Sequence, residues 1–134
     1  MKKNLFVLVL FGISLILTAC GSQEKKTATI HVEMLDVQFR PNEFTVPAGA
    51  EVTVTATNYG LARHNFIIFK KGFDAGEHFG HEDEPNIYWQ IELQPGTSAT
   101  ETFVAPLEPG EYFVACGAMS HMEDGMVAKL TVTE

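Results

Sequence analysis

The feature that most constrains the fold is a series of short apolar stretches separated by turn residues, which continues from Ala28 to the end of the chain. In the clearest of them, residues 51–57, apolar Val and Ala alternate strictly with Thr. Successive side chains of a strand point to opposite faces, so this stretch predicts a strand with one apolar and one hydroxylated face. Pro47 and Gly49 precede it and indicate a turn.

About eight stretches of this kind are expected to be strands. They are residues 29–35, 43–46, 51–57, 64–69, 87–93, 97–104, 111–116 and 126–132. No internal repeat and no long helical periodicity interrupts them. About eight short strands in about 107 residues indicate an all-β fold, an antiparallel sandwich or barrel. A domain of this size buries roughly 60 to 70% of its unfolded surface, enough to fold without disulfides.

Residues 70–86 break this rhythm with a long loop rich in Gly, His and acidic residues, which is compatible with a short helix. His78 and His81 are spaced as His-x2-His and are a candidate second metal site; the alternative is a solvated loop. The acidic run 82–84 has two interpretations as well. It steers a basic partner toward the protein, or it only keeps the protein soluble.

The N-terminus has the pattern of a secretory signal. Basic Lys2 and Lys3 precede an apolar run from Leu5 to Leu17, which is shorter than the about 20 residues of a permanent anchor. The following Thr18-Ala19-Cys20 resembles the end of a bacterial lipoprotein signal. That resemblance implies cleavage before Cys20 and a lipid on its thiol. The alternative is an uncleaved helix with a chance cysteine.

Three segments are therefore expected: a signal peptide (residues 1–19), the lipidated Cys20 with a polar, flexible tether (residues 20–27) and one folded domain (residues 28–134). Loss of Lys2 and Lys3 would change the formal charge from −8 to about −10. So acidic a domain is not expected to bind nucleic acid. Lipidation of Cys20 would also leave Cys116 unpaired in an oxidising compartment, where a bound metal would occupy its thiol.

Three candidate metal ligands occur close together, between two expected strands near the end of the chain. They are Cys116, His121 and Met126, spaced as Cys-x4-His-x4-Met. A thiolate, an imidazole and a weak thioether select copper, and a second histidine would complete a trigonal site with a long axial Met. His64, at the start of an expected strand, is the candidate. These four residues predict one copper ion.

Each ligand has a simpler interpretation. Cys116 could be a small buried core residue, and His64 a structural or surface histidine. Met126 also fits the inward face of the last strand, which leaves Met122, next to His121, as the second candidate for the axial position.

The sequence also resembles the cupredoxins, the small blue-copper proteins that include plastocyanin, azurin and auracyanin. The similarity covers nearly the whole expected domain, in segments 46–49, 58–60, 64–66, 94–96, 109–112, 116–121 and 125–126. It implies a Greek-key β-sandwich or barrel and a type 1 copper site formed by His64, Cys116, His121 and Met126. It further implies that Asn65 ties the two ligand loops together by hydrogen bonds.

The cupredoxin resemblance implies a monomeric electron carrier, and the lipoprotein-signal resemblance implies that a lipid holds it on the outer side of a bacterial membrane, at the periplasmic side or cell surface. Its partner would be a redox protein such as a cytochrome or an oxidase. Electrons would leave through the His121 edge, which is expected at the surface and ringed by Ala118, Met119 and Met122. The chain departs from many members in lacking Pro within residues 117–120, and residues 70–86 match no ligand motif.

Two other functions compete with electron transfer. The cluster of Met119, Met122 and Met126 near Cys116 is also compatible with copper(I) trafficking or resistance. An enzyme is less well supported. The chain has neither the His-x-His pairs of multicopper oxidases nor a second Cys in the ligand loop, and four protein ligands leave no open position for a substrate.

Overall fold

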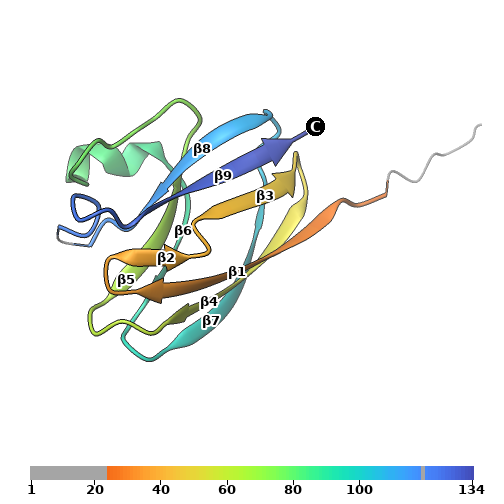
Figure 1. The fold of residues 1–134 in the computed structure, drawn as a ribbon. Helices are drawn as coiled ribbons and strands as arrows, with labels where there is room; N and C mark the ends of the chain where they lie inside the picture. The colour runs from red at the N-terminus through yellow and green to blue at the C-terminus, as the bar shows by residue number, and fades with distance from the viewer. Residues whose placement is uncertain (1–23, 119) are drawn as a thin grey trace, which may run out of the picture.

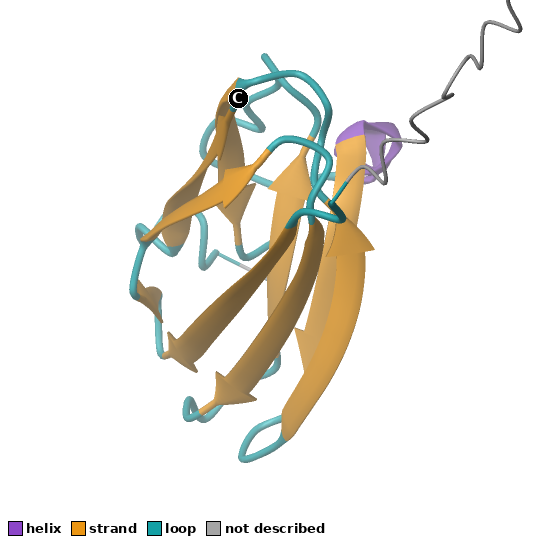
Figure 2. Ribbon diagram, turned by 90° about the vertical axis from the view of Figure 1, so that its right-hand side faces the viewer, coloured by secondary structure: helices purple, strands orange, loops and turns teal. Residues whose placement is uncertain are grey.

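The computed structural model describes residues 24–118 and 120–134, which form nine strands and one short 3-10 helix (Figures 1 and 2). The signal peptide, Cys20 and the first part of the tether predicted from the sequence lie outside the described residues, as does Met119. The elements are β1 (Thr27–Leu35), β2 (Gln38–Arg40), β3 (Glu43–Pro47), β4 (Glu51–Asn58), β5 (His64–Phe69), η1 (His81–Asn86), β6 (Ile87–Leu93), β7 (Ser98–Val104), β8 (Gly110–Ala115) and β9 (Val127–Thr133).

The strands form two sheets, in the orders β2-β1-β4-β7 and β3-β9-β8-β5-β6. This confirms the predicted all-β sandwich, with one strand more than expected. The extra strand, β2, has only three residues, with Phe39 buried between two exposed side chains, so its alternating pattern is too short to recognise in the sequence. Most strand pairs are antiparallel, as expected, but β1 with β4 and β3 with β9 are parallel. The prediction of an antiparallel sandwich was wrong for these two pairs, because alternation reports burial and not strand direction.

Side chains between the two sheets form the main core of the domain. From β4, Val52, Val54 and Ala56 are fully buried there, as their alternation predicted. Phe66 of β5 lies at its centre, with its ring edge-to-face against Phe39 at 5.2 Å and Phe44 at 5.4 Å. This packing anchors β5 at Phe66, two residues after His64, which is the first residue of the strand.

A second apolar group, called here the outer cluster, covers the other face of the five-stranded sheet. It contains Ile67, Phe69, Ala115 and Met122, with partly buried side chains that include Phe73 and Phe79. Residues 70–86 bring the latter two against the sheet, and η1 is the short helix within them. Because both faces of β5 are covered, its sequence is a continuous apolar run after Asn65 and does not alternate.

The loops that carry the expected ligands gather at one end of the sandwich (Figure 1). The loop between β8 and β9 and the turn between β1 and β2 lie there, whereas the start of the described chain and the C-terminus lie toward the opposite end. Among the described residues, no helix combines the length and the apolar character needed to cross a bilayer.

Candidate metal centre

His64 is held by the loop that precedes it. Fully buried Asn58 closes this loop: its side-chain amide donates to the carbonyl oxygens of Ala62 at 2.8 Å and Leu93 at 3.0 Å, and its Oδ1 accepts from the Gly60 N–H at 2.9 Å. His64 then begins β5 and is itself fully buried. The loop is therefore fixed by hydrogen bonds before the ring enters the interior.

Cys116 and Met126 lie at the two ends of the loop between β8 and β9. The Cys116 N–H donates to the Met126 carbonyl at 3.0 Å, and the Met126 N–H donates to the His121 carbonyl at 2.8 Å. Both side chains are fully buried in the main core. These bonds close the loop into a compact turn and place His121 beside its two ends.

Three donor atoms converge between these loops. The Cys116 Sγ lies 3.8 Å from Nδ1 of His64 and 3.5 Å from Nδ1 of His121, and the two Nδ1 atoms are 3.1 Å apart. A point equidistant from the three atoms is about 2 Å from each, close to the roughly 2.0 Å of a zinc–imidazole bond. No other group of three metal-binding His, Cys, Asp or Glu residues occurs in the described ranges. One metal ion fits between them.

Burial sets the protonation of the donors. It lowers the pKa of His64, and nearby His121 lowers it further, whereas Asp36 acts in the opposite direction. Burial also raises the pKa of the Cys116 thiol, and the backbone N–H groups of Asn65 and Ala118 counteract part of that rise. Burial therefore favours a neutral imidazole at His64 and a protonated thiol at Cys116, which must release its proton when a metal binds.

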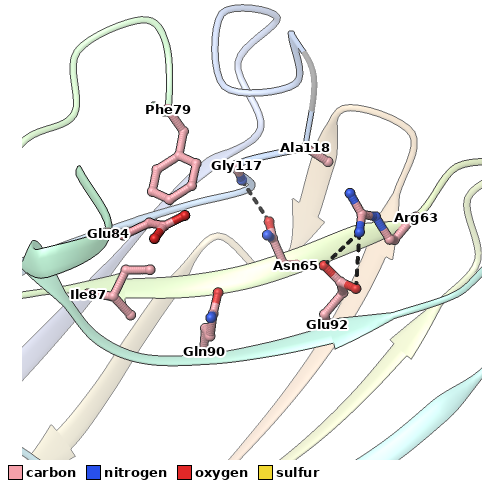
Figure 3. A pocket seen from close by; sticks show the side chains of 9 residues that line it. All are labelled: Arg63, Asn65, Phe79, Glu84, Ile87, Gln90, Glu92, Gly117 and Ala118. Carbon is pink, nitrogen blue, oxygen red and sulfur yellow. Dashed lines mark hydrogen bonds and ion pairs between the residues drawn. The ribbon is translucent and has the colours of Figure 1, made fainter. Parts of the chain in front are cut away.

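Asn65 connects the two ligand loops. Its Oδ1 accepts a hydrogen bond from the Gly117 N–H at 2.7 Å, directly after Cys116. Figure 3 shows this bond in the wall of a cavity, with Phe79 and Ala118 beside it. A Cβ at residue 117 would lie 2.6 Å from the Phe79 ring, so only glycine allows both the hydrogen bond and the close packing of residues 70–86 against the ligand loop.

Comparison with known proteins places this geometry in a family. A family model for the cupredoxin-like domain matches residues 6–132. The chain is a member of the cupredoxin family. No curated protein sequence matches it.

Solved structures of auracyanins resemble this cupredoxin. Dithionite-reduced auracyanin from the photosynthetic bacterium Roseiflexus castenholzii is 34% identical, over 81% of this chain and 99% of that one, with a TM-score of 0.69. Auracyanin B is 25% identical (83% and 92% covered, TM-score 0.68). Auracyanin A of Chloroflexus aurantiacus, described as a blue copper protein, is 25% identical (78% and 98% covered, TM-score 0.63).

A thiolate and two imidazoles around one trigonal centre are three of the donors of a blue-copper site, in which a weak axial thioether is the fourth. The site of this cupredoxin thus fits one type 1 copper ion. The two candidate thioethers lie in different surroundings: Met126 is in the main core with Cys116, whereas Met122 is in the outer cluster. Met126 thus lies on the same side of the sheet as Cys116, whereas Met122 lies on the other side.

The surroundings of His121 differ from the expectation. Ala118 and Met122 do not ring an exposed edge but are buried, because the loop turns them toward the main core and the outer cluster respectively. His121 itself is partly exposed. Large exposed apolar side chains at this end include Leu61, whose N–H donates to Asp36 beside His64. Nothing in the sequence distinguished Leu61 from any other loop residue.

The His-x2-His pair does not form a metal site with acidic residues in the structure. His78 Nδ1 lies 3.6 Å from Glu123, and His81 Nδ1 lies 3.1 Å from Glu84. Both histidine side chains are largely exposed, and neither belongs to a group of three potential ligands within the described parts of the chain. The structure therefore favours the solvated-loop interpretation.

Sequence reasoning missed Asn58, Gly60 and Asp36 as residues that shape the centre. Asn58 and Gly60 belong to a segment that the family resemblance includes, but their contacts with the His64 loop require the folded chain. Asp36 follows β1 in the sequence and meets His64 only through the turn of the other sheet. No local pattern predicts that contact.

Proposed function

We propose that this cupredoxin carries single electrons through one type 1 copper ion held by His64, Cys116 and His121, with Met126 as the axial ligand. The convergence of three donor atoms around one point about 2 Å from each is the observation that carries the proposal. When bound there, copper supplies the one-electron couple.

The protein contributes a site whose shape is set before the metal arrives. His64 and Cys116 are fully buried and adjoin strands packed in the main core, so neither side chain has room to rearrange when the charge changes. Copper(I) and copper(II) prefer different geometries, and a fixed compromise between them keeps the rearrangement small. Four protein ligands also leave no position for a substrate, which supports a carrier and not an enzyme.

The electron is proposed to leave through the ring of His121. It is the partly exposed histidine of the pair, and the two imidazole centroids are 4.7 Å apart. Exposed Leu61 at the same end offers apolar surface for a transient contact. The partner would be a redox protein such as a cytochrome or an oxidase.

Anchoring is proposed at the opposite end of the domain. A lipid on Cys20 would hold the protein on the extracytoplasmic face of a bacterial membrane. The protein is proposed to be a monomer there. The described chain begins away from the ligand loops (Figure 1), so a tether there would leave the copper end facing solution. Loss of the mass shift and of membrane association in Cys20→Ala is the expected result; an equally membrane-bound variant of unchanged mass would reject the anchor.

The acidic segment 70–86 is proposed to steer a basic partner. Its acids 82–84 are at least partly exposed, so their field extends about 10 Å at 0.1 M salt. The rate of electron transfer with a basic cytochrome should fall as salt rises, and less so in a Glu82→Gln, Asp83→Asn variant. A rate independent of ionic strength would remove the steering.

The visible spectrum tests the proposed function. Copper(II) is added to the purified full chain in detergent. An intense blue or green thiolate-to-copper band that bleaches with reductant and returns with oxidant is expected. A colourless protein that binds only copper(I) would contradict the carrier and support copper trafficking instead.

A further inference from the structure

The outer nitrogen of the His64 ring has no hydrogen-bond partner. Nδ1 faces Cys116 and His121, so Nε2 points away from the centre. Nε2 of His64 is the one buried side-chain nitrogen or oxygen without a partner among the described residues. The acidic oxygen that faces it is Oδ1 of Asp36, at 3.6 Å. A buried polar atom left unpaired costs free energy, so this arrangement calls for an explanation.

Metal binding gives Nε2 a defined chemical role. A neutral imidazole that donates its Nδ1 lone pair to a metal carries its proton on Nε2, and that N–H needs an acceptor. Histidine ligands commonly donate this second N–H to a carboxylate or a carbonyl, which fixes the ring and makes the ligating nitrogen more basic.

Asp36 is held in position by the loop that delivers His64. Its Oδ1 accepts the Leu61 N–H at 2.8 Å, and a carboxylate oxygen has a second lone pair for another donor. The separation of 3.6 Å from Nε2 is longer than a hydrogen bond, so the carboxylate must move closer by a few tenths of an ångström when the N–H is present. About half of the side chain remains exposed, which leaves it room to move.

Gly60 makes the approach of the two groups possible. A Cβ at residue 60 would overlap Nε2 of His64 and would lie 2.6 Å from Oδ1 of Asp36. Any side chain there would separate the carboxylate from the ring. The Gly60 N–H is in turn held by Asn58, so the gap between the ring and the acid is a built feature of this loop.

We propose that Asp36 is a positioning residue for the copper centre: its carboxylate accepts the Nε2–H of His64, fixes the ring and stabilises copper(II) relative to copper(I). This inference rests on the proposed function. The negative charge lies on the far side of the ring from the metal, where it favours the more highly charged oxidation state. Because Asp36 is half exposed, water screens part of this effect.

The reduction potential of the copper-loaded full chain tests the inference. Asp36→Asn keeps the shape and an oxygen for the Leu61 N–H but removes the charge, whereas Asp36→Ala removes the acceptor as well. We expect Asp36→Asn to weaken copper(II) binding about tenfold relative to copper(I), which raises the potential by about 59 mV for a one-electron couple. Asp36→Ala should raise it further. The matched control is Glu101→Gln, which removes an exposed acid of β7.

A potential in Asp36→Asn equal to that of Glu101→Gln would overturn the inference. A second measurement needs no variant. A crystal structure of the copper-loaded wild type must place Nε2 of His64 within about 3.2 Å of a carboxylate oxygen of Asp36, and a longer separation would overturn the inference as well. If the wild type shows no blue copper at all, the proposed function has failed, which is a different result from an unchanged potential in a blue protein.

Discussion

The main core and the outer cluster support the metal centre from opposite faces of one sheet, and they do so differently. The main core contains Cys116 and Met126 and anchors β5, which begins with His64. The outer cluster contains Met122, and through Phe79 it packs against Gly117. Three of the proposed ligands are thus fixed by the body of the sandwich, whereas the residues that flank Cys116 and His121 depend on segment 70–86.

This difference suggests a division of roles. The main core brings the donor atoms together, because it positions the Cys116 sulfur and the His64 ring. The outer cluster sets how firmly the loop with the partly exposed His121 is held. Substitutions in the two regions should therefore have different consequences for stability and for the copper.

The largest effect is expected where the metal itself is held. Cys116→Ser should abolish the thiolate-to-copper band and weaken copper(II) binding by at least about 100-fold. Loss of a residue that only hydrogen-bonds to a ligand typically weakens metal binding by about 10- to 100-fold, so loss of a ligand itself should weaken it more. The fold should persist, since the change in volume is small. Visible absorption and copper titration measure this.

The matched control is the other cysteine of the chain. Cys20→Ser should keep the full colour, since Cys116 is the cysteine that adjoins the two imidazoles in the part of the chain that the structure describes. Colour retained in Cys116→Ser would contradict the assignment of the ligand.

Phe66→Ala breaks the main core. The ring is fully buried and packs against two other phenylalanines, so its loss should lower the free energy of unfolding by about 3–5 kcal/mol. Chemical denaturation of the metal-free chain measures the change. A loss below about 1 kcal/mol would show that β5 is not anchored by this packing.

Asn65→Ala removes the bond between the two ligand loops. The Gly117 N–H would lose its acceptor at 2.7 Å, which should cost about 1–3 kcal/mol and weaken copper binding by about 10- to 100-fold. Titration with a competing copper chelator gives the affinity. Asn65→Asp keeps an acceptor oxygen and should recover much of the loss; equal losses in both variants would argue against this bond as the cause.

Phe79→Ala breaks the outer cluster and should have the smallest effect on stability. Its ring is only partly buried, so burial of its apolar area accounts for about 1–2 kcal/mol. The Phe79 ring lies against Gly117, so its loss should loosen the ligand loop directly. Phe79→Ala should therefore release copper faster than Phe66→Ala, although Phe79→Ala should have the higher free energy of unfolding. Stopped-flow transfer of copper to a chelator compares them, and the reverse order of rates would contradict the division of roles.

The main core was largely predictable from the sequence, and the outer cluster was not. Alternation in residues 51–57 reports one buried face, which the structure confirms. The spacing of Cys116, His121 and Met126 predicted three donors of the proposed copper site. A continuous apolar run such as 66–69 does not reveal which residues face which cluster, so the burial of Met122 required the structure.

Contacts across the two sheets were also beyond the sequence. Asp36 and His64 meet because the turn after β1 lies beside the loop before β5. Gly60 lies between the two side chains, and a glycine in the sequence does not indicate that it makes room for such a contact. Such contacts depend on strand order, which local patterns do not encode.

X-ray absorption at the copper K edge of the oxidised full chain tests the central claim most directly, because it reports the atoms bound to the metal. The account predicts one close sulfur donor and two imidazole nitrogens, with the sulfur signal lost in Cys116→Ser. A spectrum of the wild type with only nitrogen and oxygen donors would contradict it.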